Sequence, residues 1–129
     1  MRISQVVILI SLACLIGDVA RAEDWVRVRG PNGQGISSEK GLPTKWSGTS
    51  NVAWKTAIPG KGWSSPIVYK DRVFLTTSTE EGVSCRVVCV NRKNGNVEWN
   101  KEVHRQKTGA MRRENSFATP TPVTDGKRV

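Results

Sequence analysis

The chain has 129 residues, of which 24% are charged and 37% hydrophobic, and its formal net charge is +9. That length suffices for one small domain. A basic balance can indicate a nucleic-acid or anionic partner, but the basic residues are scattered, and the densest groups are Arg112-Arg113 and Lys127-Arg128. Because an electrostatic footprint requires clustering, we expect no nucleic-acid binding.

The first 22 residues have the three parts of a secretory signal peptide. Arg2 provides a short positive region, an apolar stretch runs from Val6 to Ile16, and Ala20-Arg21-Ala22 has the form of a signal-peptidase site. An apolar stretch of about 11 residues is too short to cross roughly 30 Å of hydrocarbon as a helix. We expect residues 1–22 to be cleaved, the protein to be exported to the periplasm or the exterior, and no membrane span to remain. A retained signal peptide is the alternative.

Residues 23–50 form a turn-rich N-terminal segment. Glycine and asparagine, which tolerate positive φ, alternate with proline, which fixes φ, around Arg29–Gly35. The glycine order there is G-x-x-G-x-G, and no strand–helix context surrounds it. This order differs from the dinucleotide-binding fingerprint, so we predict consecutive turns and no phosphate cradle.

From Asn51 onward the sequence predicts an all-β fold. Short stretches rich in β-branched and aromatic residues are separated by turn-forming residues at 79–82 and 92–95. No stretch outside the signal peptide has helical spacing of apolar residues. The predicted strands are Asn51–Ile58, Ile67–Lys70, Val73–Ser78, Cys85–Asn91 and Val97–Val103.

Two cysteines remain after removal of the signal peptide. Cys85 and Cys89 lie four positions apart, or about 13 Å along a strand at ~3.3 Å per residue. A disulfide requires Cα atoms within about 7 Å, so the two cannot pair within a regular strand. With a single histidine, His104, the sequence favours two small buried residues over a metal site.

A nine-residue phrase occurs twice. It runs from Ser65 to Val73 and returns from Thr121 to Val129, so that Pro66 and Pro122 lie 56 positions apart. A repeat of this size indicates a supersecondary unit that stacks on copies of itself, since one copy cannot bury its apolar face alone. Because the second copy reaches Val129 within a predicted first strand, we expect the chain to be the N-terminal part of a longer array.

A shorter phrase ending in tryptophan also recurs. The phrase that ends at Trp54 returns at Trp99, an offset of 45. The basic, polar loop Gln106–Ser116 accounts for the 11 residues by which the two offsets differ. Insertions in repeat proteins gather on loops that often carry function, although a plain solvated loop is the alternative. Four short antiparallel strands in about 40 residues match one blade of a β-propeller.

The stretch 89–99 resembles the tryptophan-docking repeat of the quinoprotein-like (PQQ-repeat) β-propellers of secreted bacterial type, with the pattern Ala-x-Asp-x-x-Thr-Gly-x-x-x-Trp. Gly95 and Trp99 match, and the Ala, Asp and Thr are replaced by Cys89, Asn91 and Asn94. We expect Gly95 to allow a positive-φ corner, Asn91 to close the turn with its side-chain carbonyl, and Trp99 to be a buried anchor against a neighbouring blade.

The resemblance covers about residues 25–129 and includes the opening Trp25–Pro31 and the strand entries around residues 62–66 and 115–123. It implies that residues 51–129 are a partial propeller repeat domain, truncated at its C-terminal side. That domain would hold about one complete blade of four antiparallel strands, with flanking strands of an eight-bladed propeller. Trp54 would belong to the last strand of the preceding blade.

The resemblance leaves the function open, because one fold hosts many functions. We favour a non-catalytic binding or scaffolding module that meets other exported or envelope proteins. The alternatives are a fragment of a quinoprotein dehydrogenase, which would oxidise alcohols or sugars with pyrroloquinoline quinone and calcium, and a remnant without activity. The carboxylates Asp71, Asp125 and Glu114 fit turns or solvated surface, and we expect Trp63 to pack rather than stack on a ligand. We therefore assign no catalytic, cofactor-binding or metal residue.

Overall fold

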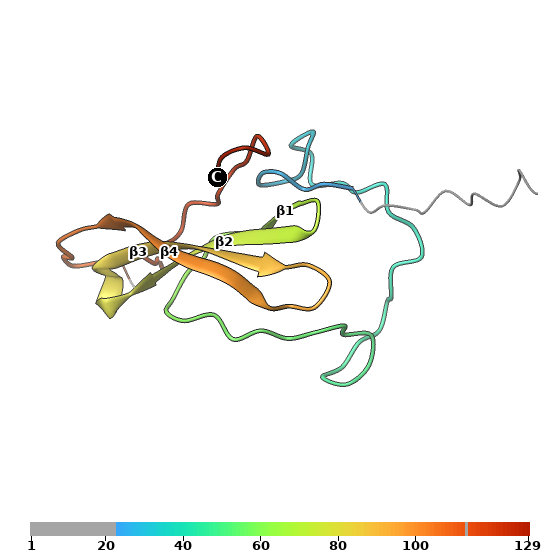
Figure 1. The fold of residues 1–129 in the computed structure, drawn as a ribbon, viewed down its shortest axis with the longest axis horizontal. Coiled ribbons are helices and arrows are strands. Elements are labelled where there is room, and N and C mark those ends of the chain that lie inside the picture. The colour runs from blue at the N-terminus through green and yellow to red at the C-terminus, as the bar shows by residue number, and fades with distance from the viewer. Residues whose placement is uncertain (1–22, 113) are drawn as a thin grey trace, which may run out of the picture.

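The computed structural model describes residues 23–112 and 114–129, and the regular structure of this part is one antiparallel sheet. The strands are β1 (Ile67–Tyr69), β2 (Arg72–Thr79), β3 (Ser84–Asn91) and β4 (Val97–Arg105), with a 3₁₀ turn, η1 (Glu80–Gly82), between β2 and β3. They lie side by side in chain order, as Figure 1 shows. The all-β fold class is confirmed, while the predicted signal peptide lies outside the described residues. The described part contains no helix that could cross a membrane.

The four predicted strands from Ile67 onward are confirmed within one or two residues at their ends. The β1–β2 turn is tight because Lys70 takes a left-handed conformation, with φ at 53°. The register between β3 and β4 shifts twice, between Cys85 and Arg86 and between Cys89 and Val90. Such bulges increase the twist and re-aim side chains near the strand ends.

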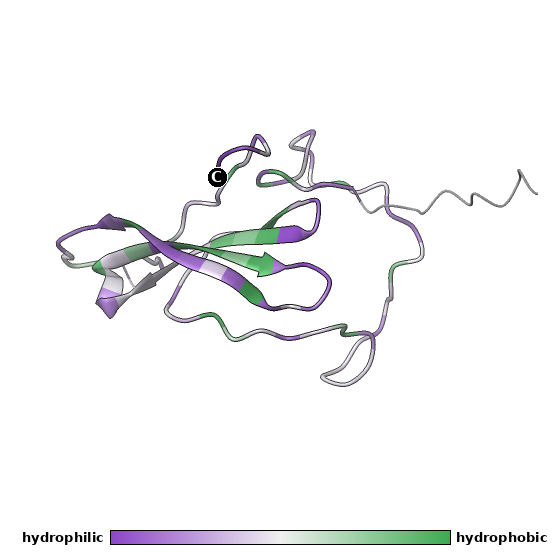
Figure 2. Ribbon diagram, in the orientation of Figure 1, coloured by the Kyte–Doolittle hydropathy of each residue, from purple (hydrophilic) through white to green (hydrophobic). Residues whose placement is uncertain are grey.

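The core is one rung that crosses all four strands. Ile67, Phe74, Cys89 and Trp99 are register partners from β1 to β4. The side chains of Ile67 and Cys89 are 0% exposed, and Tyr69 and Trp99 pack against this cluster as partly buried neighbours. Figure 2 shows hydrophobic residues within the sheet, and hydrophilic residues in the turns and along much of β4. Burial of this rung supplies the main apolar contact between the strands.

Strand β4 is mostly exposed and carries charged residues along its length. Lys101, Glu102 and Arg105 occupy its second half, and Arg105 pairs with both Glu80 and Glu102. Charges on an edge strand oppose pairing with a further strand. The polar half of β4 is therefore built as an outer edge.

Two predicted strands are wrong. Residues 51–58 form no strand, because this segment bonds to the β3–β4 turn through the side chains of Trp54 and Thr56 instead of a backbone ladder. Residues 121–129 also form no strand. The carboxylate of Asp125 accepts from the backbone N–H groups of Lys127 and Arg128, at 2.8 Å each, and folds this segment into a turn.

Candidate functional site

The β3–β4 turn is closed by Asn91, as predicted. Its side-chain Oδ1 accepts from the backbone N–H groups of Lys93 at 2.9 Å and Asn94 at 3.3 Å. The Gly95 N–H donates to the Asn91 carbonyl at 2.8 Å, and the φ of Gly95 is 75°. An Asn side chain that mimics a backbone turn and a glycine in the left-handed region define a rigid corner.

Trp54 docks on this corner from 38 residues upstream. Its indole N–H donates to the Arg92 carbonyl at 2.7 Å, and two positions later the Thr56 hydroxyl donates to the Gly95 carbonyl at 2.5 Å. A Cβ atom at Gly95 would lie 2.7 Å from the Trp54 ring. The ring therefore lies directly on the glycine, and only a residue without a side chain permits this contact.

The amide of Asn91 also reaches the opposite side of the turn. Its Nδ2 donates to Glu98 at 3.1 Å, and Arg72 from β2 donates to the same carboxylate at 2.9 Å. The hydrogen bonds from Arg72 and then Asn91 hold the pKa of Glu98 below its usual value. Burial and then the nearby Glu98 charge raise the pKa of the Cys89 thiol to about 11. The turn, Glu98 and the core rung thus form one connected unit.

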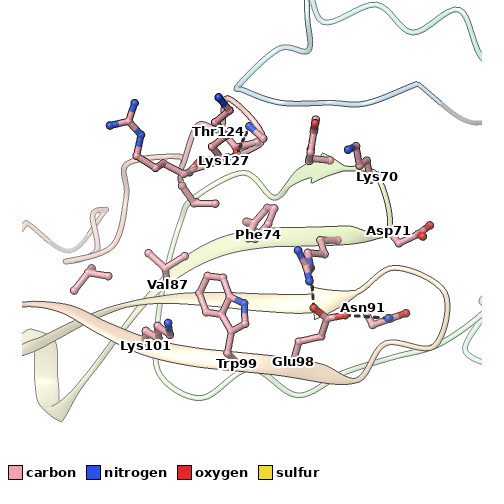
Figure 3. Close-up of a pocket in the computed structure, with 16 residues that line it drawn as sticks. Lys70, Asp71, Phe74, Val87, Asn91, Glu98, Trp99, Lys101, Thr124 and Lys127 are labelled. Atoms are coloured by element: carbon pink, nitrogen blue, oxygen red, sulfur yellow. Dashed lines mark hydrogen bonds and ion pairs between the residues drawn. The ribbon is translucent and has the colours of Figure 1, made fainter.

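A cavity of about 670 Å³ opens beside Trp99, between the sheet and the C-terminal segment. Figure 3 shows Phe74 and Trp99 on the sheet side of this cavity, with Thr124 and Lys127 on the other. The ring centroids of Phe74 and Trp99 are 5.9 Å apart and tilted by 43°. Trp99 is half-buried and lines the cavity. It therefore offers apolar surface that the described residues leave partly uncovered.

Lysine side chains lie over two of the aromatic rings that line the cavity, Tyr69 and Trp99. The ammonium groups of Lys70 and Lys101 lie 5.0 Å and 5.6 Å from the ring centroids of Tyr69 and Trp99, respectively. Lys127 and Arg128 line the same cavity from the C-terminal segment. Cations over aromatic faces are attracted by the ring quadrupole. The surface near Trp99 is an aromatic patch with a basic rim, and we call it the Trp99 surface. Its aromatic residues are Tyr69, Phe74 and Trp99, and its basic residues are Lys70, Lys101, Lys127 and Arg128.

The remaining candidate groups take ordinary structural roles. Cys85 and Cys89 are free thiols, and the expectation that both are buried holds for Cys89 alone, because Cys85 is only partly buried. Asp71 pairs with Lys93 at 3.2 Å, and Asp125 closes its own turn. The part of the chain that the structure describes contains no cluster of three or more His, Cys, Asp or Glu side chains that could hold a metal ion.

The structure brings most of the motif residues together at one end of the sheet. Cys89 lies in the buried rung, Asn91 and Gly95 form the turn, Trp54 covers it, and Trp99 lies at the nearby cavity. Pro66 and Pro122 lie outside this group, Pro66 exposed before β1 and Pro122 half-buried in the C-terminal segment.

Sequence reasoning missed Thr56 and misjudged Trp63. Thr56 could have been found from its two-residue spacing to Trp54, since alternate residues of an extended chain share a side. The expectation that Trp63 packs is wrong, because its side chain is 65% exposed. The backbone N–H of Trp63 donates to the Ala118 carbonyl, while its ring lies at the surface.

Comparison of the chain with protein-family models, with curated proteins and with solved structures finds no match.

Proposed function

We propose that this chain contributes a β-propeller-type sheet unit of the PQQ-repeat kind to an exported, non-catalytic binding or scaffolding module. The observation that carries the proposal is the docking of Trp54 on the Asn91–Gly95 turn. A tryptophan from one repeat phrase covers the turn that precedes the same phrase in its next copy. Repeat proteins are stabilised by such contacts between neighbouring units.

The two copies of the longer phrase support this arrangement, because their equivalent positions lie close together. The Ser65 N–H donates to the hydroxyl of Thr121, its equivalent 56 residues later, at 3.0 Å. Lys70 and Gly126 are also equivalent, and both take left-handed φ values, 53° and 86°. Matching backbone conformations at matching positions are what a structural repeat requires.

We propose that the Trp99 surface receives another sheet unit of the same kind. Trp99 holds the position of Trp54 in the repeat phrase. Trp54 is covered by a turn with a glycine at its corner, so the complementary partner of Trp99 is a second turn of that form. An aromatic anchor of this size contributes strongly to an interface when it is desolvated. Assembly of such units would create the broad surface on which other exported or envelope proteins bind.

Sedimentation velocity over a concentration series tests this proposal. We expect the purified protein to self-associate through the Trp99 surface and Trp99→Thr, which keeps a strand-forming residue, to shift the distribution toward monomer. Trp46→Thr is the matched control, because Trp46 is 71% exposed and lies outside the sheet. Monomer at every concentration, or equal effects of the two substitutions, would contradict the proposal.

The dehydrogenase alternative has its own test. The protein is mixed with pyrroloquinoline quinone, calcium, an alcohol or glucose, and a redox dye. A non-catalytic module gives the same dye reduction as a sample without protein. Turnover that requires both the quinone and the protein would favour the dehydrogenase reading.

A further inference from the structure

A second cavity, of about 970 Å³, lies away from the Trp99 surface. Three chain segments line it: residues 60–63 before β1, the β2–β3 connection at 78–82, and the end of the inserted loop at 115–117, with Met111. Its volume falls at the upper end of the ~300–1,000 Å³ typical of small-molecule sites. None of its lining residues belongs to the Asn91–Gly95 turn or to the Trp99 surface.

Trp63 lies at this cavity, exposed yet held by its backbone. Its N–H donates to the Ala118 carbonyl at 3.1 Å, and Lys61 exchanges two backbone hydrogen bonds with Ser78, both 2.9 Å. Gly60 fits closely against β2, because a Cβ atom there would lie 2.2 Å from the Ser78 carbonyl oxygen. The indole is therefore presented to solvent from a fixed segment. A fixed aromatic face stacks on a ligand at low entropic cost.

Polar groups with unused hydrogen-bonding capacity share the cavity. The Asn115 Oδ1 accepts from the Ser116 N–H at 2.9 Å and from the Thr119 hydroxyl, which orients the amide, while its Nδ2 has no partner among the described residues. Glu80 pairs with Arg105, whereas Glu81 and Lys61 form no ion pair within the described part of the chain. These two opposite charges leave the cavity close to neutral.

The backbone at the cavity is strained. Glu80 and Glu81 both take left-handed conformations, with φ of 52° and 53°. Residues other than glycine rarely adopt this conformation, because the Cβ atom crowds the backbone. Glu81 lines the cavity together with residues of the inserted loop.

We propose that this cavity binds a neutral oligosaccharide. A sugar ring carries an apolar C–H face and a rim of hydroxyl groups. The indole of Trp63 suits the apolar face, and the carboxylate of Glu81 and the amide of Asn115 suit the hydroxyls as acceptor and donor. A near-neutral lining favours an uncharged sugar over an acidic one. The inserted loop, which provides Asn115, thereby gains a specific role.

The test is an NMR titration that observes the five tryptophan indole N–H signals. The probes are cellotetraose, maltotetraose and chitotetraose. We expect at least one of them to shift the Trp63 signal saturably while the Trp46 signal stays in place. Trp63→Ala should weaken binding about tenfold or more, and Trp46→Ala should leave the affinity unchanged. Glu81→Asn, a residue that tolerates the left-handed conformation, should weaken binding several-fold while the chain stays folded.

Three results would overturn this inference. The first is the absence of any saturable Trp63 shift with all three probes at concentrations on the order of 10 mM. The second is an equal shift of Trp46, which would indicate non-specific contact with exposed indoles. The third is tighter, salt-dependent binding of a tetragalacturonate probe, which would make the ligand acidic. Because the Trp99 surface lies elsewhere, failure here leaves the sedimentation test unaffected.

Discussion

Replacement of Gly95 by alanine should destabilise the Asn91–Gly95 turn on which Trp54 docks. The structure divides the expected loss of stability into two parts. Gly95 is buried and has a φ of 75°. The new Cβ would lie 2.7 Å from ring atoms of Trp54 and 2.8 Å from the Thr56 hydroxyl. The substitution therefore imposes backbone strain and also a steric clash.

The backbone strain and the steric clash can each be assigned a magnitude. An L-residue in the left-handed region costs about 1–2 kcal/mol, and overpacking of a close contact costs typically 1–3 kcal/mol. We expect Gly95→Ala to lower the free energy of unfolding by roughly 2–5 kcal/mol. Gly35 is a matched control, because its φ is also 75° and a Cβ there would meet nothing within 4 Å. Gly35→Ala should cost only the backbone part, about 1–2 kcal/mol.

The assay is urea unfolding followed by far-UV circular dichroism, with equal m-values required across the variants. A double substitution isolates the clash, because Trp54→Ala removes the ring that the new methyl group meets. In the Trp54→Ala background, Gly95→Ala should cost less than in the otherwise unchanged protein but more than Gly35→Ala, because the new methyl group still meets the Thr56 hydroxyl at 2.8 Å. Residues in direct contact show such non-additivity, whereas distant residues do not.

Equal costs of Gly95→Ala and Gly35→Ala in the otherwise unchanged protein would refute this reasoning. That result would mean that Trp54 does not lie on Gly95. Full additivity of Gly95→Ala and Trp54→Ala would lead to the same conclusion.

Trp54→Phe keeps an aromatic ring but removes the indole donor to Arg92, and should cost about 1 kcal/mol in urea unfolding. The pKa of Cys89 is raised from 9.0 to about 11 in the fold, so the folded chain binds a proton there more tightly than the unfolded chain does. Stability should therefore fall as the pH rises from about 9 to about 11, and Cys89→Val should remove this slope. The lowered pKa of Glu98 stabilises the fold above about pH 4.5, and that contribution should be lost on acidification and absent in Glu98→Gln. From the proposed export and signal-peptide cleavage, mass spectrometry of the mature protein should find an N-terminus at Glu23, whereas an intact Met1 would contradict cleavage.

The sheet was predictable because its signals are local. Stretches of β-branched residues, separated by the turn-forming Asp71, Asn94 and Gly95, determine the strands and corners within a few residues of each other in sequence. Asn91 and Gly95 belong to one turn, so their pattern indicated the geometry that the structure has.

The errors arose where distant contacts decide the structure. Trp54 and Thr56 sit in a strand-like stretch, but bonds to residues 92 and 95 hold them at the end of the sheet. Trp63 is of a residue type common in cores, but its ring is exposed and its backbone bonds to Ala118, 55 residues away. Periodicity within a segment cannot report partners more than 35 residues away.

The docking of Trp54 on the Asn91–Gly95 turn can be observed directly by NMR. We expect nuclear Overhauser contacts between ring protons of Trp54 and the Hα protons of Gly95. The Trp54 indole N–H, bonded to the Arg92 carbonyl at 2.7 Å, should exchange with solvent far more slowly than the exposed indole of Trp46. Absence of those contacts, together with equally fast exchange of the two indoles, would mean that Trp54 does not dock on the turn.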